Sequence, residues 1–189
     1  MFCCGSEGVK IYLIRHGRAA EGWGESDDPG LDSMGREQAV QVSQTLQAIN
    51  PMPIVSSPMK RARETAEPLA QAWECIPEID SRFSEILTPE YIPRNRKAWI
   101  KDILSKRWDA LDTDLQSWRE TLLTALCSLT QDTVVFTHFI AINAIAGKAM
   151  HDNKVLVFLP DNTSITTVKV AGPAITLLEK GTEMPTIVG

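Results

Sequence analysis

The chain contains three histidines, and two of them come one residue after a mostly apolar run. His16 lies between Arg15 and Gly17, after the apolar residues 9–14. At the carboxyl end of a strand, Arg15 could hold an anion while Gly17 lets the backbone approach that anion closely. The tripeptide therefore predicts an anion site with an imidazole beside it. A turn with a surface ion pair is the alternative that the tripeptide alone leaves open.

His138 repeats this pattern, because it follows the apolar residues 133–136 and begins a predicted helix. A histidine at a helix N-terminus tends to stay neutral, since the helix dipole disfavours a positive charge there. An anion held between His16 and His138 would remove that penalty, and a structural buried histidine is the alternative. The third histidine, His151, lies in a polar stretch and is expected in an exposed loop.

An arginine and a glutamate complete the set of candidate residues. Ser57 and Pro58 are a helix-start signal, and Arg61 follows one turn later. Helix N-termini attract phosphate through their free amides, and an arginine there adds a bidentate donor. Glu85 comes after a short extended segment and is the candidate acid. A surface carboxylate is the alternative at that position.

Strands and helices alternate along the chain, which predicts an α/β protein with a three-layer α/β/α sandwich and a mostly parallel central sheet. Strands are expected at residues 9–14, 54–56, 133–136, 164–170 and 174–178, the last two as an antiparallel pair. Helices are expected at residues 34–49 with Ser33 as cap, 58–73 and 115–129, and from His138 onward. Residues 88–116 are interpreted as a short helical cap insertion in one domain that spans residues 1–189.

The composition is that of an ordinary globular protein. Of the 189 residues, 43% are hydrophobic, and 19 Lys and Arg stand against 24 Asp and Glu. The resulting net charge of −5 argues against nucleic acid or an acidic membrane as partner. The four cysteines lack CxxC spacing, and no membrane span or secretory signal is visible. We therefore expect a cytoplasmic protein with reduced thiols, and the sequence leaves its oligomeric state open.

Three sequence blocks together resemble the histidine phosphatase superfamily, in its phosphoglycerate-mutase-like branch 1. The blocks are Arg15-His16-Gly17, residues 56–66 (SSPMKRARETA) and Thr137-His138, in the order of that family. Weaker features that also fit are Gly35, Gln38 and Ala39, and residues 161–165 (DNTSI). The resemblance covers about residues 9–170, and the three blocks are specific when taken jointly.

The resemblance implies a role for each candidate residue. His16 would be the nucleophile that becomes phosphohistidine, and Arg15, Arg61 and His138 would surround the transferred phosphoryl group. Glu85 would be the proton donor to the leaving alcohol and later the base for water. No metal and no other cofactor is implied, because positively charged side chains and a second imidazole stabilise the charge on the phosphoryl oxygens.

The chain departs from the family pattern at several places. After Glu85 it reads ILTPEY, where many members carry a Phe-Gly-x-Trp-Glu-Gly-like stretch, so Glu90 is a second candidate for the acid. Arg18, an expected substrate contact, stands with two alanines where mutases usually have a small polar residue. The predicted cap is also shorter than in typical mutases. These departures favour a phosphatase over a mutase.

The sequence therefore predicts a metal-independent phosphomonoesterase of the histidine acid phosphatase type. Its partner would be a small phosphorylated metabolite or a phosphoprotein, hydrolysed through a phosphohistidine on His16. A phosphoglycerate-type mutase and a non-catalytic phospho-ligand-binding domain are the two alternatives. Retention of His16 with both arginines and His138 argues against the binding domain, because binding alone requires no nucleophile.

Overall fold

A computed structural model of the chain describes residues 8–21, 28–86 and 96–185. Cys3, Cys4 and Glu90 lie outside these ranges, as do residues 88–95 of the predicted cap insertion. None of the helices in the described ranges combines the length and the apolar character that a membrane span requires.

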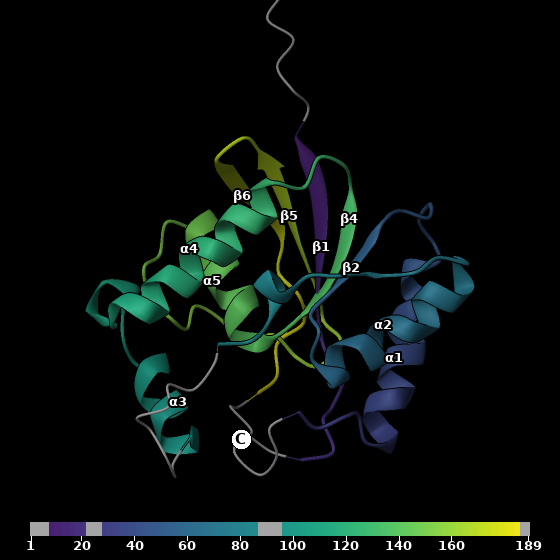
Figure 1. The fold of residues 1–189 in the computed structure, drawn as a ribbon, viewed down its shortest axis with the longest axis horizontal. Coiled ribbons are helices and arrows are strands. Elements are labelled where there is room, and N and C mark those ends of the chain that lie inside the picture. Colours follow the sequence, from purple (N-terminus) through teal and green to yellow (C-terminus); the bar gives the residue numbers. More distant parts are fainter. Residues whose placement is uncertain (1–7, 22–27, 87–95, 186–189) are drawn as a thin grey trace, which may run out of the picture.

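A six-stranded mixed sheet forms the centre of the fold (Figure 1). In chain order the strands are β1 (Val9–Arg15), β2 (Ile54–Ser56), β3 (Glu78–Ile79), β4 (Thr133–Thr137), β5 (Ile165–Ala171) and β6 (Ala174–Glu179). Their spatial order is β3-β2-β4-β1-β5-β6, with β3, β2, β4 and β1 parallel. β5 runs antiparallel to β1 and forms a hairpin with β6. The α/β prediction and the antiparallel final pair are confirmed.

Helices cover both faces of this sheet (Figure 1). Figure 1 shows α1 (Ser33–Leu46) and α2 (Lys60–Ala72) on one side, and α4 (Thr113–Cys127) and α5 (Phe139–Ala149) on the other. Side chains of β1 alternate between the two faces of the sheet. Ile11 and Leu13 belong to the apolar cluster that includes residues of α4 and α5. Ile14 belongs to the other cluster, which includes residues of α1 and α2. Burial on both faces explains why this strand reads as a continuous apolar run.

Two helix starts differ from the sequence prediction. Asp32, and not Ser33, caps α1, because the Asp32 carboxylate accepts a hydrogen bond of 2.7 Å from the amide of Gly35. α1 also ends at Leu46, three residues before the predicted end. α2 begins at Lys60, and its N-cap residue Met59 makes no side-chain cap bond. The hydroxyl of Ser57, the predicted cap, accepts a bond of 3.3 Å from the amide of Met59 and lies 2.8 Å from Nε2 of His138.

The described part of the predicted cap insertion packs on the main core. It contains α3 (Arg96–Leu104) and the 3-10 helix η2 (Trp108–Ala110), and α4 begins within its predicted bounds. Trp99 and Trp108 are buried and belong to the same apolar cluster as Leu122 of α4. Figure 1 shows α3 toward the end of the sheet at which β1 finishes. This places α3 on the side of the molecule where the candidate residues gather.

Candidate active site

The candidate residues follow the parallel strands at their carboxyl ends. Arg15 ends β1 and His16 comes next, while His138 follows β4 and is the N-cap of α5. Arg61 lies in the first turn of α2, after β2. Glu85 comes after β3 and the 3-10 helix η1 (Ser81–Phe83). Because β3, β2, β4 and β1 are parallel neighbours, all five side chains are delivered to one edge of the sheet.

The two histidines lie next to each other. Their ring centroids are 5.2 Å apart with an angle of 57° between the ring planes. The backbone amide of His16 donates to the carbonyl of Thr137 at 3.0 Å, which extends the β1–β4 ladder by one residue. His16 is 7% exposed and His138 is fully buried. The pairing of strands therefore fixes the spacing of the two imidazoles.

The hydrogen bonds of His16 define its protonation state. Its Nδ1 lies 2.8 Å from the carbonyl oxygen of Gly17, which can only accept, so Nδ1 carries the proton. Its Nε2 accepts a hydrogen bond of 3.1 Å from Nε of Arg61 and is therefore unprotonated. Burial lowers the pKa of His16 well below 6.5, and the charges of Arg61 and Arg15 lower it further. His16 is thus a neutral imidazole whose Nε2 lone pair can act as a nucleophile.

Two buried guanidiniums flank this imidazole. Nη1 of Arg15 donates to the carbonyl of Pro160 at 2.8 Å, and Nη1 of Arg61 lies 3.9 Å from a carboxylate oxygen of Asp28. Burial lowers the pKa of Arg15 to about 10, which leaves it cationic at neutral pH. Nε of Arg15 is buried and has no hydrogen-bond partner among the described residues. Such a pair of planar donors suits a tetrahedral oxyanion.

Glu85 is a buried carboxyl that is bonded to the first turn of α5, the helix that His138 caps. It is 3% exposed, and its two oxygens accept bonds of 3.1 Å from the amides of Ile86 and Ile140. Burial raises the pKa of Glu85, while the two amide bonds and the charges of Arg61 and Arg96 act in the opposite direction. The net effect is a raised pKa, so the carboxyl keeps its proton to higher pH. A group in this state can act as a general acid.

His138 is held by a residue that sequence reasoning missed as part of the site. Its Nε2 lies 2.8 Å from the hydroxyl of Ser57, and its Nδ1 is buried without a partner in the described ranges. Burial lowers the pKa of His138 well below 6.5, and the nearby Arg61 lowers it further. The sequence placed Ser57 at a helix start and within the family block of residues 56–66, but it gave no local sign of the contact with His138, which lies 81 residues away.

The loop before β5 fixes the backbone of Arg15 and His16. The side-chain amide of Asn162 donates to the carbonyl of His16 at 2.9 Å, and the backbone amide of Thr163 donates to the carbonyl of Arg15 at 3.0 Å. Thr163 has φ of +55°, which is an unfavourable conformation for a β-branched residue. Strain of this kind persists where neighbouring contacts enforce it. In the sequence, this segment was only a weaker family feature.

Two other predicted residues lie elsewhere. The guanidinium of Arg18 is bonded to the Asp32 carboxylate at 2.5 Å and its side chain is 57% exposed, so a contact of Arg18 with substrate stays a prediction. His151 is exposed and lies in the turn after α5. Within residues 8–21, 28–86 and 96–185, no three His, Cys, Asp or Glu side chains form a group that could hold a metal ion.

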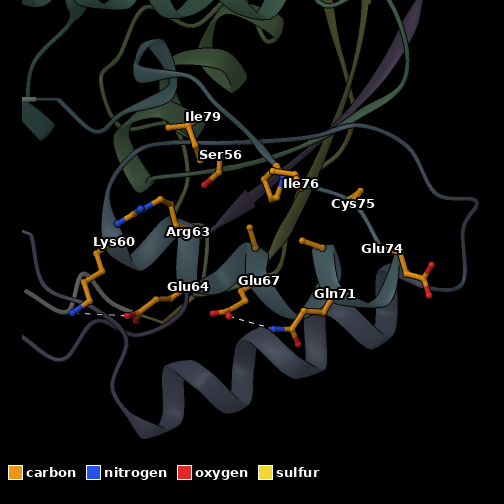
Figure 2. Close-up of a pocket in the computed structure, with 13 residues that line it drawn as sticks. Ser56, Lys60, Arg63, Glu64, Glu67, Gln71, Glu74, Cys75, Ile76 and Ile79 are labelled. Carbon is orange, nitrogen blue, oxygen red and sulfur yellow. Dashed lines mark hydrogen bonds and ion pairs between the residues drawn. The ribbon is translucent and has the colours of Figure 1, made fainter.

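A separate groove of about 710 Å³ runs between α2 and the β3 edge of the sheet (Figure 2). Within its lining, Lys60 forms an ion pair with Glu64, and the side-chain amide of Gln71 donates to the carboxylate of Glu67. Its walls include Cys75 and none of the five residues gathered at the strand ends. The groove therefore has no part in the chemistry described above.

Comparisons with known proteins identify a matching family and similar sequences. The family model described as the histidine phosphatase superfamily (branch 1) matches residues 11–182. A relative from Salmonella paratyphi C named "Probable phosphoglycerate mutase GpmB" is 32% identical over 123 residues, which are 61% of this chain and 50% of that protein. The chain thus spans about half the length of the curated relatives it matches.

Solved structures share the fold. The phosphoserine phosphatase of Entamoeba histolytica, in complex with 3-phosphoglyceric acid, has a TM-score of 0.73 at 21% identity, over 93% of this chain and 98% of that chain. A mycobacterial glucosyl-3-phosphoglycerate phosphatase in complex with inorganic phosphate has a TM-score of 0.71 at 19% identity, over 93% of this chain and 98% of that chain.

Proposed function

The chain belongs to the histidine phosphatase superfamily, branch 1, and on that premise we propose that it hydrolyses phosphomonoesters through a phosphohistidine on His16. The protonation state of His16 carries this proposal. Its Nε2 is unprotonated and faces the guanidinium of Arg61, and its ring centroid lies 5.2 Å from that of a second imidazole, His138. A site that only bound a phosphate group would gain nothing from a neutral nucleophile in this position.

In the first half of the reaction, Nε2 of His16 attacks the phosphorus atom and the bond from phosphorus to the ester oxygen breaks. Arg15, Arg61 and His138 hold the equatorial oxygens, on which the charge is spread in the transition state. Glu85 transfers its proton to the departing alcohol oxygen and becomes a carboxylate. The raised pKa of Glu85 supports this role, because the carboxyl must be protonated at the start.

In the second half, a water molecule attacks the phosphorus atom of the phosphohistidine. The Glu85 carboxylate takes the proton from this water, and the phosphorus–nitrogen bond breaks to release phosphate. His16 returns to its neutral state and Glu85 is protonated again. The amides of Ile86 and Ile140 keep the carboxyl in place through both halves of the cycle.

We place this activity with the metal-independent, histidine acid phosphatase type of phosphomonoesterase. Two guanidiniums and an imidazole supply the positive charge and the donors that phosphoryl transfer requires. Turnover is therefore expected to persist after treatment with a strong metal chelator. Loss of turnover that returns when a divalent ion is added back would contradict this assignment.

A mutase is the second candidate, because the relatives that match are named as phosphoglycerate mutases. A mutase returns the phosphoryl group to another hydroxyl of the same substrate, whereas a phosphatase gives it to water. The two activities separate when 3-phosphoglycerate is supplied and both inorganic phosphate and 2-phosphoglycerate are measured. We expect phosphate to be the dominant product.

Turnover of phenyl phosphate tests the proposal against a non-catalytic binding domain. We expect the wild-type chain to release phosphate and His16→Asn to be slower by about 10³-fold or more. His151→Asn is the matched control, because His151 is exposed and asparagine tolerates its positive φ of 55°. Equal turnover in wild type and His16→Asn would refute the proposal.

A further inference from the structure

A methionine sulfur atom is in contact with the guanidinium of Arg61. Nη2 of Arg61 donates to Sδ of Met59 at 3.3 Å. The other two nitrogens of this guanidinium also have partners, since Nε donates to His16 and Nη1 lies 3.9 Å from the Asp28 carboxylate. A thioether is the weakest acceptor of the three. Nη2 is therefore the nitrogen that Arg61 can most easily give to a bound anion.

The backbone holds Met59 in this place. Met59 is the N-cap residue of α2, and its carbonyl accepts bonds from amides in the first turn of that helix. Its own amide donates at 3.3 Å to the hydroxyl of Ser57, which lies 2.8 Å from Nε2 of His138. Met59 is thus linked to two parts of the site, to Arg61 through its sulfur and to Ser57 through its amide.

The sulfur of Met59 also has access to solvent. Met59 is half-buried, so a small solute can reach its side chain. A second methionine, Met184, has its sulfur 3.8 Å from Nη1 of Arg15, but Met184 is only 9% exposed. Oxidation of methionine to its sulfoxide turns an apolar side chain into a polar one. Of these two sulfur atoms beside site arginines, that of Met59 is the more accessible to an oxidant.

We propose that Met59 is a modification site, at which oxidation of the thioether to the sulfoxide by a peroxide weakens phosphate binding in the active site. This inference rests on the proposed function. The sulfur attacks one oxygen of hydrogen peroxide, so a sulfur–oxygen bond forms while the oxygen–oxygen bond breaks. The other oxygen leaves with the remaining protons as water. Sulfur loses two electrons, and the peroxide gains them.

The new oxygen changes the acceptor that Arg61 meets. A sulfoxide oxygen carries a partial negative charge and accepts a hydrogen bond from a guanidinium much better than a thioether does. Because this oxygen forms on an atom 3.3 Å from Nη2, it competes with a phosphoryl oxygen for the same donor. Loss of one charge-assisted hydrogen bond is expected to lower the affinity for phosphate by about ten- to a hundredfold.

Peroxide treatment of matched variants tests this inference. Wild type, Met59→Leu and Met150→Leu are treated with hydrogen peroxide, and the oxidised methionines are mapped by mass spectrometry. The kcat/KM for phenyl phosphate is then compared with the untreated value of the same protein. We expect about a tenfold or greater loss in wild type and in Met150→Leu, in step with oxidation of Met59, and little loss in Met59→Leu. Met150 is the control because it is exposed and follows α5.

Reversal distinguishes the sulfoxide from oxidised thiols. Dithiothreitol reduces disulfides and sulfenic acids, including those formed by the free Cys75 and Cys127, whereas a methionine sulfoxide requires the sulfoxide reductases. We expect activity to return only when the reductases that act on both sulfoxide epimers are added with dithiothreitol. Recovery with dithiothreitol alone, equal losses in wild type and Met59→Leu, or Met59 that stays unoxidised while the exposed Met34 and Met150 are oxidised would overturn the inference.

Calorimetry separates a failure of this inference from a failure of the proposed function. If the untreated wild type hydrolyses no phosphomonoester, the proposed function is wrong. Binding of inorganic phosphate to wild type and to Met59→Leu, before and after peroxide, still tests Met59. We expect the affinity to fall by about tenfold or more in wild type only. An equal change in both proteins, or no change in the oxidised wild type, would overturn the inference, and no phosphate binding by the untreated wild type would overturn both proposals.

Discussion

The Nε–H group of Arg61 points at Nε2 of His16 across 3.1 Å. Because Nε of Arg61 can only donate, Nε2 of His16 is the acceptor of this bond. In addition to burial, the charge of Arg61 lowers the pKa of His16. A phosphoryl group approaching Nε2 also comes within reach of the N–H groups of Arg61. Burial first, and the charge of Arg61 second, keep His16 neutral. Under the proposed function, Arg61 is also positioned to stabilise the phosphoryl group that His16 attacks.

Arg61→Ala is expected to weaken inhibition by vanadate and phosphate by about 2–5 kcal/mol, because a buried charged contact is lost. Arg61→Lys is expected to recover a part of this loss, since it keeps the charge without the two-pronged geometry. Inhibition constants measured against an aryl phosphate check both variants. Arg63→Ala, at an exposed position of the same helix, is the control. Unchanged vanadate inhibition in Arg61→Ala would show that Arg61 does not face the bound anion.

Glu85→Gln is expected to slow hydrolysis of an alkyl phosphate by about 10²–10⁴-fold while largely sparing a nitrophenyl phosphate. The alkyl alcohol needs the proton of Glu85 in order to leave, whereas nitrophenolate hardly needs one. Since the carboxyl must start protonated, the alkyl rate should fall as pH rises through the raised pKa of Glu85. This limb of the profile should be absent in Glu85→Gln.

Glu90→Gln tests the alternative acid that the sequence left open. We expect this variant to hydrolyse both phosphates within a small factor of wild type. If Glu90→Gln is the variant that loses only the alkyl substrate, the assignment of the acid to Glu85 is wrong.

The buried histidines predict how stability depends on pH. Burial lowers the pKa of His16 and of His138 well below 6.5, so below pH 6.5 the unfolded chain binds protons at these positions that the folded chain does not. Each histidine therefore reduces the free energy of unfolding as pH falls below 6.5, by up to about 1.4 kcal/mol per pH unit. Histidine titrates between about pH 5 and 8. Urea unfolding of wild type and His16→Asn across this range measures the contribution of His16 by difference.

Glu85 acts on stability in the opposite sense. Its pKa is raised from 4.5, so its contribution is fully present below pH 4.5 and is lost as pH rises through its folded-state pKa. The comparison with His16→Asn isolates the histidine, because Glu85 remains in both proteins. A pH dependence that is identical in the two proteins would mean that His16 is not a buried neutral imidazole.

Asn162→Ala is expected to lower kcat by about ten- to a hundredfold while changing the inhibition constant of phosphate much less. Its side-chain amide holds the carbonyl of His16, and a small displacement of the nucleophile slows attack more than it weakens anion binding. Steady-state kinetics and phosphate inhibition of the variant check this expectation. Asn153→Ala is the control, at an asparagine whose side chain contacts Arg119. Equal losses of kcat and phosphate affinity would assign Asn162 to anion binding instead.

Much of the fold was readable from the sequence because burial leaves a pattern. β1 and β4 are buried on both faces and therefore appear as short apolar runs, and the final hairpin turns at Gly172, whose φ is +60°. The predicted helix boundaries were less accurate than the predicted strands, because two adjacent residues can each serve as the N-cap of the same helix. Asp32 and Ser33 are both good caps, and only the bond to Gly35 distinguishes them.

The gathering of the candidate residues was predictable where a candidate side chain stands beside a strand end or a helix start in the chain. His16, Arg61 and His138 each stand beside a local signal, namely a strand end or a helix start. The contact of Ser57 with His138 and that of Asn162 with His16 span 81 and 146 residues, so no local pattern announces them.

The covalent intermediate on His16 tests the account most directly. Wild-type protein is mixed with phosphorus-32-labelled phenyl phosphate and quenched in alkali, in which phosphohistidine survives, and the labelled residue is mapped by mass spectrometry. We expect an acid-labile label on Nε2 of His16 in wild type and in His151→Asn, and none in His16→Asn. A label of equal yield in His16→Asn, or turnover by wild type without any label on His16, would contradict the account.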